Sequence, residues 1–318
     1  MYIAKIGIYG IMKKMKGGEG MTTKAWLGKN TVSLQGKTVA ISGSTGGLGK
    51  ALCAHMAALG VARLILLDRN ADKAEALKNA LTQRYPDFCV EFVLTDLADM
   101  HSVEDAAKAL ETLPIDALIL NAGAYAVPRF ITSSGYDNVF QINFAAPYYL
   151  VRRLASHLAT RGGRVVLVGS IAHNYSKTDP RDVDFRTRKK ASLVYGNAKR
   201  YLMFAAPEAA ERAGLELAVT HPGIAVTGIT AHYPKWLYAL IKYPMKFIFM
   251  KPKRASLSIL RGLFETPSKG YWIGPRAFDV WGLPRTSFLH TCDAREKAFI
   301  CAEAERVYQN LCEQEGRA

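Results

Sequence analysis

The chain has 318 residues, of which 49% are hydrophobic, so it can form one large α/β domain or two small ones and is neither disordered nor collagen-like. Its formal charge of +15 permits an anionic partner, but no Cys/His finger, RNP-like motif or helix-turn-helix signal occurs, so we expect no nucleic-acid partner. The five cysteines form neither a CxxC pair nor a metal-ligand pattern, which indicates reduced thiols, no metal site and a cytoplasmic protein.

Residues 1–35 are interpreted as a poorly ordered N-terminal extension. Their apolar part is interrupted by Lys5 and glycines, and most of their lysines follow it, unlike the order in a secretory signal. No apolar run reaches the roughly 18 residues needed to cross a bilayer. We therefore expect a soluble or peripheral protein whose folded domain spans residues 36–318.

From Lys37 onward, apolar β-branched runs alternate with stretches of helical periodicity. This alternation predicts a doubly wound, Rossmann-type parallel sheet in a single domain, with ligands at the carboxyl ends of the strands. The expected strands are Thr38–Ser42, Arg63–Asp68, Cys89–Thr95, Asp116–Leu120, Arg164–Ser170 and Glu216–His221, and the first expected helices are Leu48–Leu59, Asp72–Arg84 and Ser102–Leu110.

A glycine-rich turn follows the first expected strand and opens a helix. Glycines allow a tight turn, and they let backbone N–H groups and the helix N-terminus approach a pyrophosphate. The strand-turn-helix context therefore favours dinucleotide binding over an ordinary loop. The candidate residues are Gly43, Ser44, Gly47, Leu48 and Gly49.

Other candidate cofactor contacts follow the next three strands. Asp68 ends the second strand, where a carboxylate accepts hydrogen bonds from the adenosine ribose, which favours NAD. Arg69 comes next and could instead bind a 2′-phosphate, so NADP is the alternative. Asp96 and Leu97 are candidates for adenine contact, although the aspartate could simply cap a loop or helix. The last candidates form a small-residue turn, Asn121, Ala122 and Gly123.

Tyr195 and Lys199 lie four residues apart, so a helix would place both on one face. A tyrosine with its ordinary pKa of about 10 is a poor proton shuttle, and a value near 7 requires roughly 4 kcal/mol. A cation about 4 Å away, in an effective dielectric of about 20, supplies roughly that much. We therefore expect Lys199 to lower the pKa of Tyr195, although the spacing alone occurs by chance on many helices.

Together these motifs resemble the short-chain dehydrogenase/reductase family over about residues 37–230. Ser42 stands where the family glycine motif has threonine, and Leu120 departs from its Asn-Asn-Ala-Gly turn. The resemblance implies that Asn143, Ser170, Tyr195 and Lys199 are catalytic. It further implies that Pro222, Gly223 and Thr227 contact the cofactor.

The resemblance implies hydride transfer between NAD(P) and an alcohol or carbonyl substrate. Tyr195 would exchange the proton and Lys199 would hydrogen-bond the nicotinamide ribose. Ser170 would position the substrate oxygen, and Asn143 would hold a water that connects Lys199 to solvent. Homodimers and homotetramers are common in this family.

Two variable segments bear on the substrate. The long insertion between Ser170 and Tyr195 resembles the retinol dehydrogenase and protochlorophyllide reductase branch, which suggests a bulky apolar substrate. Residues from about 225 to 265 are predicted to form a small helical lid, followed by a strand near residues 270–274 and a C-terminal helix over Asp293–Glu313.

Other functions remain open. Aromatic residues and lysines interleave over residues 234–254, which also suits peripheral contact with an anionic membrane. The alternatives to an enzyme are therefore a catalytically silent dinucleotide sensor and a peripheral membrane-binding member of the same fold. Retention of the Tyr195/Lys199 pair favours the enzyme.

Overall fold

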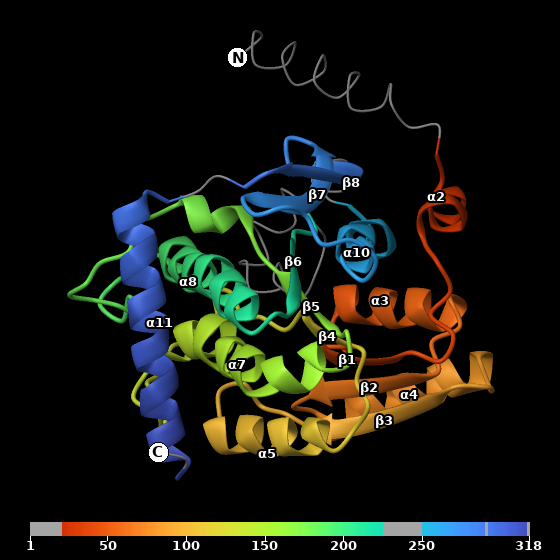
Figure 1. Cartoon of the computed structure of the whole chain (residues 1–318), viewed down its shortest axis with the longest axis horizontal. Helices are drawn as coiled ribbons and strands as arrows, with labels where there is room; N and C mark the ends of the chain where they lie inside the picture. The colour runs from red at the N-terminus through yellow and green to blue at the C-terminus, as the bar shows by residue number, and fades with distance from the viewer. Residues whose placement is uncertain (1–20, 225–249, 290–291, 317–318) are drawn as a thin grey trace, which may run out of the picture.

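The computed structural model describes residues 21–224, 250–289 and 292–316 (Figure 1). Its centre is an eight-stranded sheet in the order β3-β2-β1-β4-β5-β6-β7-β8. All neighbouring strands are parallel except the last pair, β7 and β8. The predicted doubly wound sheet is confirmed.

The expected strands are present, with small changes at their ends. The first two match the expectation to the residue, whereas β5 ends two residues earlier, so that Ser170 lies beyond it. The strands are β1 Thr38–Ser42, β2 Arg63–Asp68, β3 Cys89–Leu94, β4 Ala117–Leu120, β5 Arg164–Val168, β6 Glu216–Thr220, β7 Tyr271–Ala277 and β8 Trp281–Phe288.

Helices cover both faces of the sheet, and each face has its own hydrophobic cluster. One layer contains α2 Thr23–Asn30, α3 Gly47–Ala58, α4 Ala71–Arg84 and α10 Pro252–Arg261. The other contains α5 Met100–Glu111, α7 Ala146–Ala159, α8 Ala191–Arg212 and α11 Ala294–Gln314. Three short segments complete the described elements: α6 Asn138–Phe140, the π-helical turn η1 Gln141–Ala145 and the 3-10 turn η2 Ile171–Asn174.

The expectation of poor order for the first 35 residues needs correction from Met21 onward. Residues 23–30 form α2, whose N-cap Thr22 accepts a hydrogen bond from the Ala25 N–H. Trp26 and Leu34 are both buried in the hydrophobic cluster that α3 and α10 also line. This part of the extension therefore belongs to the folded domain. Residues 1–20 lie outside the described residues.

The expected lid includes a segment that is part of the core. Helix α10 packs on α3, and its Leu257, Ile259 and Leu260 are fully buried in the cluster on that face. A lid can therefore involve only the residues before α10, and residues 225–249 lie outside the described residues. In the described part of the chain, no helix combines the length and apolar character needed to cross a membrane.

Candidate active site

The glycine turn between β1 and α3 lies at the carboxyl edge of the sheet. Gly43 has a φ of +66°, and a Cβ there would lie 2.9 Å from the Ala122 Cα atom, so only glycine fits. Gly46 is the N-cap of α3 and has no side chain to accept from the first amides of the helix. The turn therefore leaves room and free N–H donors for an anionic group, as a pyrophosphate requires.

Asp68 binds this turn, and its carboxylate is buried. The Ser44 N–H donates to Oδ2 at 3.0 Å and the Thr45 hydroxyl to Oδ1 at 2.7 Å. The Ser44 hydroxyl and the Thr45 N–H donate as well. A carboxylate offers about four acceptor positions, so these donors fill them in this arrangement. The predicted contact of Asp68 with a ribose stays a prediction that requires rearrangement of the turn.

The second small-residue turn is joined to the first by Ser42. Its hydroxyl accepts from the N–H groups of Asn121 and Ala122 at 3.1 and 3.0 Å. The Asn121 side chain donates back to the carbonyl oxygens of Ser42 and Gly43, both at 3.0 Å. Ser42, which stands where the family has threonine, therefore fixes the geometry between β1 and β4.

Most predicted cofactor residues line one cavity of about 850 Å³. Ser44 does not line it, because this residue is fully buried against Asp68 behind the turn. Leu97 lines the cavity and is also packed in the core, and Asp96 uses its side chain to accept from the Ala98 N–H. The predicted residues that the cavity unites are Gly43, Gly47, Leu48, Gly49, Asp68, Arg69, Asp96, Leu97, Asn121, Ala122 and Gly123.

Sequence reasoning missed several residues of this cavity. Thr45 and Lys73 lie near Arg69 on the nucleotide side, and Tyr125 follows the second turn by two residues. Their positions close behind recognised motifs could have identified them. Val127 and Phe130 also line the cavity, and Phe130 is 54% exposed despite its size. No motif pointed to these two.

Tyr195 and Lys199 share one face of α8, as expected, and Ser170 caps the 3-10 turn η2 directly after β5. The Lys199 Nζ atom lies 5.9 Å from the centre of the Tyr195 ring and donates to the Val168 carbonyl at 2.9 Å. The ring of Tyr125, from the cavity wall, packs edge-on against Tyr195 with centroids 5.3 Å apart. The catalytic candidates thus adjoin the cofactor cavity.

Asn143 lies on the π-helical turn η1 and is fully buried. Its side-chain nitrogen donates to the carbonyl oxygens of Ala124 and Val139, each at 2.8 Å, and its oxygen accepts from the Ala124 N–H at 3.2 Å. A Cβ on Gly123 would lie 2.8 Å from that oxygen and 3.8 Å from the Lys199 Nζ atom. Asn143 therefore holds the second turn close to Lys199.

The protonation of the pair differs from the expectation. Burial raises the pKa of Tyr195 to about 12, against an opposing hydrogen bond with Ser170. Burial also lowers the pKa of the Lys199 ammonium to about 8. The prediction that Lys199 brings the pKa of Tyr195 close to 7 is therefore wrong for the protein groups alone, because the low polarity of the site disfavours both charges.

The Pro222-Gly223 turn lies beside the β7–β8 hairpin. Gly223 has a φ of +75°, and the Ile224 N–H donates to the Val280 carbonyl at 3.1 Å. Pro222 and Gly223 are absent from the lining of the described cavity. Thr227 lies outside the described residues. The predicted contacts of these three residues with a cofactor stay predictions.

Comparison with known proteins supports the resemblance. A family model described as short chain dehydrogenase matches residues 37–179, somewhat less than half of the chain. Over this segment the chain is similar to the short-chain dehydrogenase/reductase family. Human retinol dehydrogenase 13 is 29% identical over 207 residues, 63% of this chain and 62% of that protein, which supports the retinol dehydrogenase-like branch of the short-chain dehydrogenase/reductase family.

Other relatives agree with this assignment. A short chain dehydrogenase of Aspergillus nomiae, rstn4, is 36% identical over 156 residues, 46% of this chain and 42% of that protein. A crystal structure of an uncharacterized protein from Mycobacterium paratuberculosis superimposes with a TM-score of 0.70 at 26% identity, covering 91% of this chain and 98% of that one. The chain spans 42% to 66% of the length of the first curated relatives.

Proposed function

We propose that the protein is an NAD(P)-dependent oxidoreductase that interconverts an apolar alcohol and its carbonyl compound, with Tyr195 as the acid and base. The observation that carries the proposal is the convergence of Ser170, Tyr195 and Lys199 beside the cavity that the glycine turn lines. A catalytically silent binding protein has no need to keep a phenol, a hydroxyl and the buried Lys199 ammonium together.

The nucleotide side of the cavity fits a dinucleotide. Gly43 admits no Cβ, the start of α3 offers free N–H donors, and the volume of about 850 Å³ is in the range of small-molecule sites. Arg69 and Lys73 are exposed on the same wall, where they could bind a 2′-phosphate, while Asp68 is held by the turn. NAD and NADP therefore remain alternative cofactors. The bound nicotinamide would supply or accept the hydride.

The side chains divide the remaining work. With a pKa of about 12, the Tyr195 hydroxyl is protonated at neutral pH, so it can donate its proton to an oxygen that gains negative charge during carbonyl reduction. Ser170 hydrogen-bonds Tyr195 and would orient the same substrate oxygen. Lys199, with a pKa of about 8, can carry a charge at neutral pH that stabilises a phenolate in the oxidative direction.

The substrate side of the cavity supports an apolar substrate. Val127, Pro128 and Phe130 line it, and more than half of Phe130 is exposed, although an aromatic ring of this size is usually buried. An apolar substrate would cover this surface and gain about 25 cal/mol for each Å² removed from water. Membrane contact through residues 234–254 and homodimer or homotetramer formation stay predictions.

The test is a panel of apolar aldehydes, ketones and alcohols, assayed by absorbance at 340 nm with NADH, NADPH and their oxidised forms in turn. We expect turnover by the wild-type chain and a loss of about 10²-fold or more in Tyr195→Phe. Dinucleotide affinity, measured by calorimetry, should stay within about twofold in this variant. Tight dinucleotide binding without any turnover by the wild type would instead support the sensor.

A further inference from the structure

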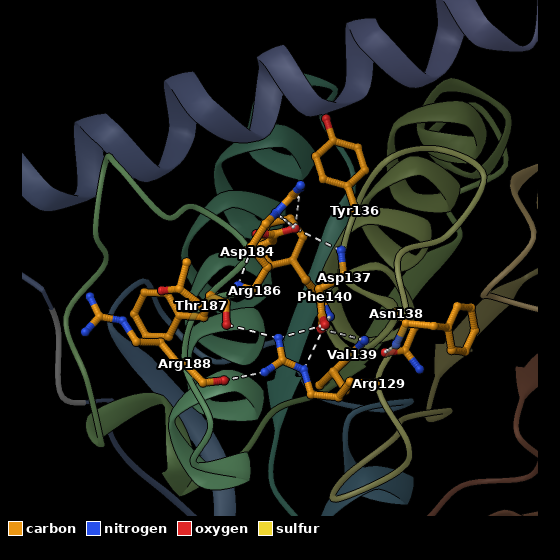
Figure 2. A network of polar contacts seen from close by, with 12 residues as sticks. Arg129, Tyr136, Asp137, Asn138, Val139, Phe140, Asp184, Arg186, Thr187 and Arg188 are labelled. Carbon is orange, nitrogen blue, oxygen red and sulfur yellow. Dashed lines mark hydrogen bonds and ion pairs between the residues drawn. The ribbon is translucent and has the colours of Figure 1, made fainter.

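Arg129, in the loop before α6, joins two segments that are more than 50 residues apart in the sequence (Figure 2). Its Nε atom donates to the Asp137 carboxylate at 2.8 Å. Its two terminal nitrogens donate to the carbonyl oxygens of Phe185, at 3.0 Å, and Arg188. One guanidinium thus connects the loop at residues 128–138 to the insertion that precedes α8.

A second ionic contact runs parallel to the first. The Asp137 N–H donates to the Asp184 carboxylate at 2.8 Å, and Arg186 donates to the same carboxylate at 2.8 Å and to the Gly135 carbonyl at 2.7 Å. The side chains of Asp137 and Asp184 are only 3% and 4% exposed. Charge-assisted hydrogen bonds to buried carboxylates are stronger than exposed ion pairs, so these contacts hold the insertion firmly.

Phe185 lies between the two contacts in an unusual backbone conformation. Its φ is +54°, a left-handed value that costs a residue other than glycine about 1–3 kcal/mol. Its ring is nevertheless buried, in a cluster with Val139 and Val194 against which Val127 and Tyr195 pack. Such strain persists only where the surrounding contacts impose it. The polar contacts on either side of Phe185 provide that constraint.

The same contacts also extend to Asn143, another of the catalytic candidates. Asp137 is the N-cap of α6, where its Oδ1 atom accepts from the N–H groups of Val139 and Phe140 at 3.0 and 3.4 Å. That helix leads directly into η1 and Asn143. The insertion also contacts the catalytic helix, because the buried Asn197 donates to the Val183 carbonyl at 2.7 Å.

We propose that residues 182–188 form a fixed wall behind the substrate site, and that Arg129 is the positioning residue that holds this wall against Tyr195. The role of this wall in substrate binding rests on the proposed function, whereas the contacts that hold the wall do not depend on it. Val127 lines the cavity and, like Tyr195, packs against the cluster that contains Phe185. Displacement of the wall would therefore change the shape of the substrate side while leaving the nucleotide side in place.

Limited trypsin digestion tests the wall without any assay of activity, because Arg186 and Arg188 are themselves cleavage sites. In the wild type we expect slow cleavage after these residues, mapped by mass spectrometry. Arg129→Met should accelerate it at least tenfold, since proteolysis follows the population of the locally open form. Arg129→Lys retains a charge beside Asp137 and should give a smaller increase. Arg161→Met, an exposed arginine at the opposite end of the sheet, is the control.

Kinetics with an apolar substrate from the panel test the positioning role. Arg129→Lys should raise KM about fivefold or more, while kcat changes less than about threefold and dinucleotide affinity is kept. Equal cleavage rates in all variants would overturn the wall, and faster cleavage with an unchanged KM would overturn its role in substrate binding. A wild-type chain without turnover would count against the proposed function, yet the digestion would still decide on the wall.

Discussion

Arg200 of α8, the residue after Lys199, forms a buried ion pair with Glu296 of α11. Arg200 Nε lies 2.8 Å from Oε1 and Nη2 lies 2.6 Å from Oε2, and both side chains are less than 10% exposed. The remaining terminal nitrogen of Arg200 donates to the His173 carbonyl at 3.0 Å, and the His173 ring lies 2.6 Å from the Ser170 carbonyl. The ion pair therefore supports the turn that carries Ser170.

Replacing Glu296 should affect both stability and turnover. Glu296→Gln leaves the Arg200 charge buried without its counter-charge, which costs about 3 kcal/mol in the free energy of unfolding. We expect kcat to fall about tenfold as Ser170 loses support, measured with urea titration alongside the kinetic assay. Glu305 lies on α11, as Glu296 does, and forms a partly exposed ion pair with Arg152. Glu305→Gln should therefore cost less than about 1 kcal/mol in the free energy of unfolding. Similar losses in the two variants would contradict the supporting role.

Asp68→Ala should weaken both cofactors together. The carboxylate accepts from Ser44 and Thr45, so its removal leaves four donors of the turn without their partner and disturbs the whole glycine turn. We expect the affinities for NADH and NADPH to fall by similar factors, with a loss of about 2 kcal/mol or more in stability. The exposed Arg69 is the matched comparison, since Arg69→Ala should weaken NADPH selectively and leave stability unchanged. A selective loss of NADH in Asp68→Ala would mean that the carboxylate binds the ribose instead.

Tyr195 should stay protonated to high pH in the chain without dinucleotide. Burial raises the pKa of its hydroxyl to about 12. The difference in absorbance at 295 nm between the wild type and Tyr195→Phe isolates this side chain from the other tyrosines. We expect no difference signal from a phenolate below about pH 11. A phenolate signal that appears near pH 7 would instead support the expectation that Lys199 lowers the pKa of Tyr195.

His221 should make the fold less stable in acid. Burial lowers its pKa to about 4, and its ring stacks on Trp272 with centroids 4.9 Å apart. Because the unfolded chain binds a proton near pH 6.5, this contribution is present above that pH and is lost as the pH falls toward 4. Between pH 7.5 and 5.0 the wild type should lose about 2 kcal/mol more than His221→Phe, which keeps the stacked ring. The exposed His101→Gln should behave as the wild type does.

Trp26 should be required for stability although it precedes the expected domain. Its side chain is buried in the cluster that α3 and α10 also line, so Trp26→Ala should cost about 3–5 kcal/mol. The exposed Val32 nearby provides the control, since Val32→Ala should change stability by less than about 0.5 kcal/mol. A melting temperature that is unchanged in Trp26→Ala would show that α2 is dispensable.

The sequence predicted those parts of the fold that depend on local pattern. The apolar runs of β1 and β2 and the glycine turn between β1 and α3 follow from residues close together in the chain. Strand β8 was missed, because Gly282, Pro284 and Arg285 interrupt its pattern, and proline is tolerated there only because the strand lies at the edge of the sheet.

The contacts of the site were harder to predict, because they join distant parts of the chain. Asp68 is 24 residues from Ser44, and Arg129 is 59 residues from Arg188. A sequence motif shows which residue types are present. It does not show which hydrogen-bond acceptors, such as the Asp68 carboxylate, are already used by donors elsewhere in the fold. Burial, which also sets the protonation of Tyr195 and Lys199, follows from the complete fold.

The position of α11 has a consequence for synthesis. This last described helix covers α7 and α8 and buries Ile300, Val307 and Leu311 against them (Figure 1). While the chain emerges from the ribosome, the face of α8 that α11 covers stays exposed until these residues have been made. Glu296, the ion-pair partner of Arg200, belongs to the same helix and is made at the same stage. The candidate site is therefore completed only after α11 has been made, and a nascent chain that stalls before Glu296 exposes apolar surface to chaperones and to neighbouring chains.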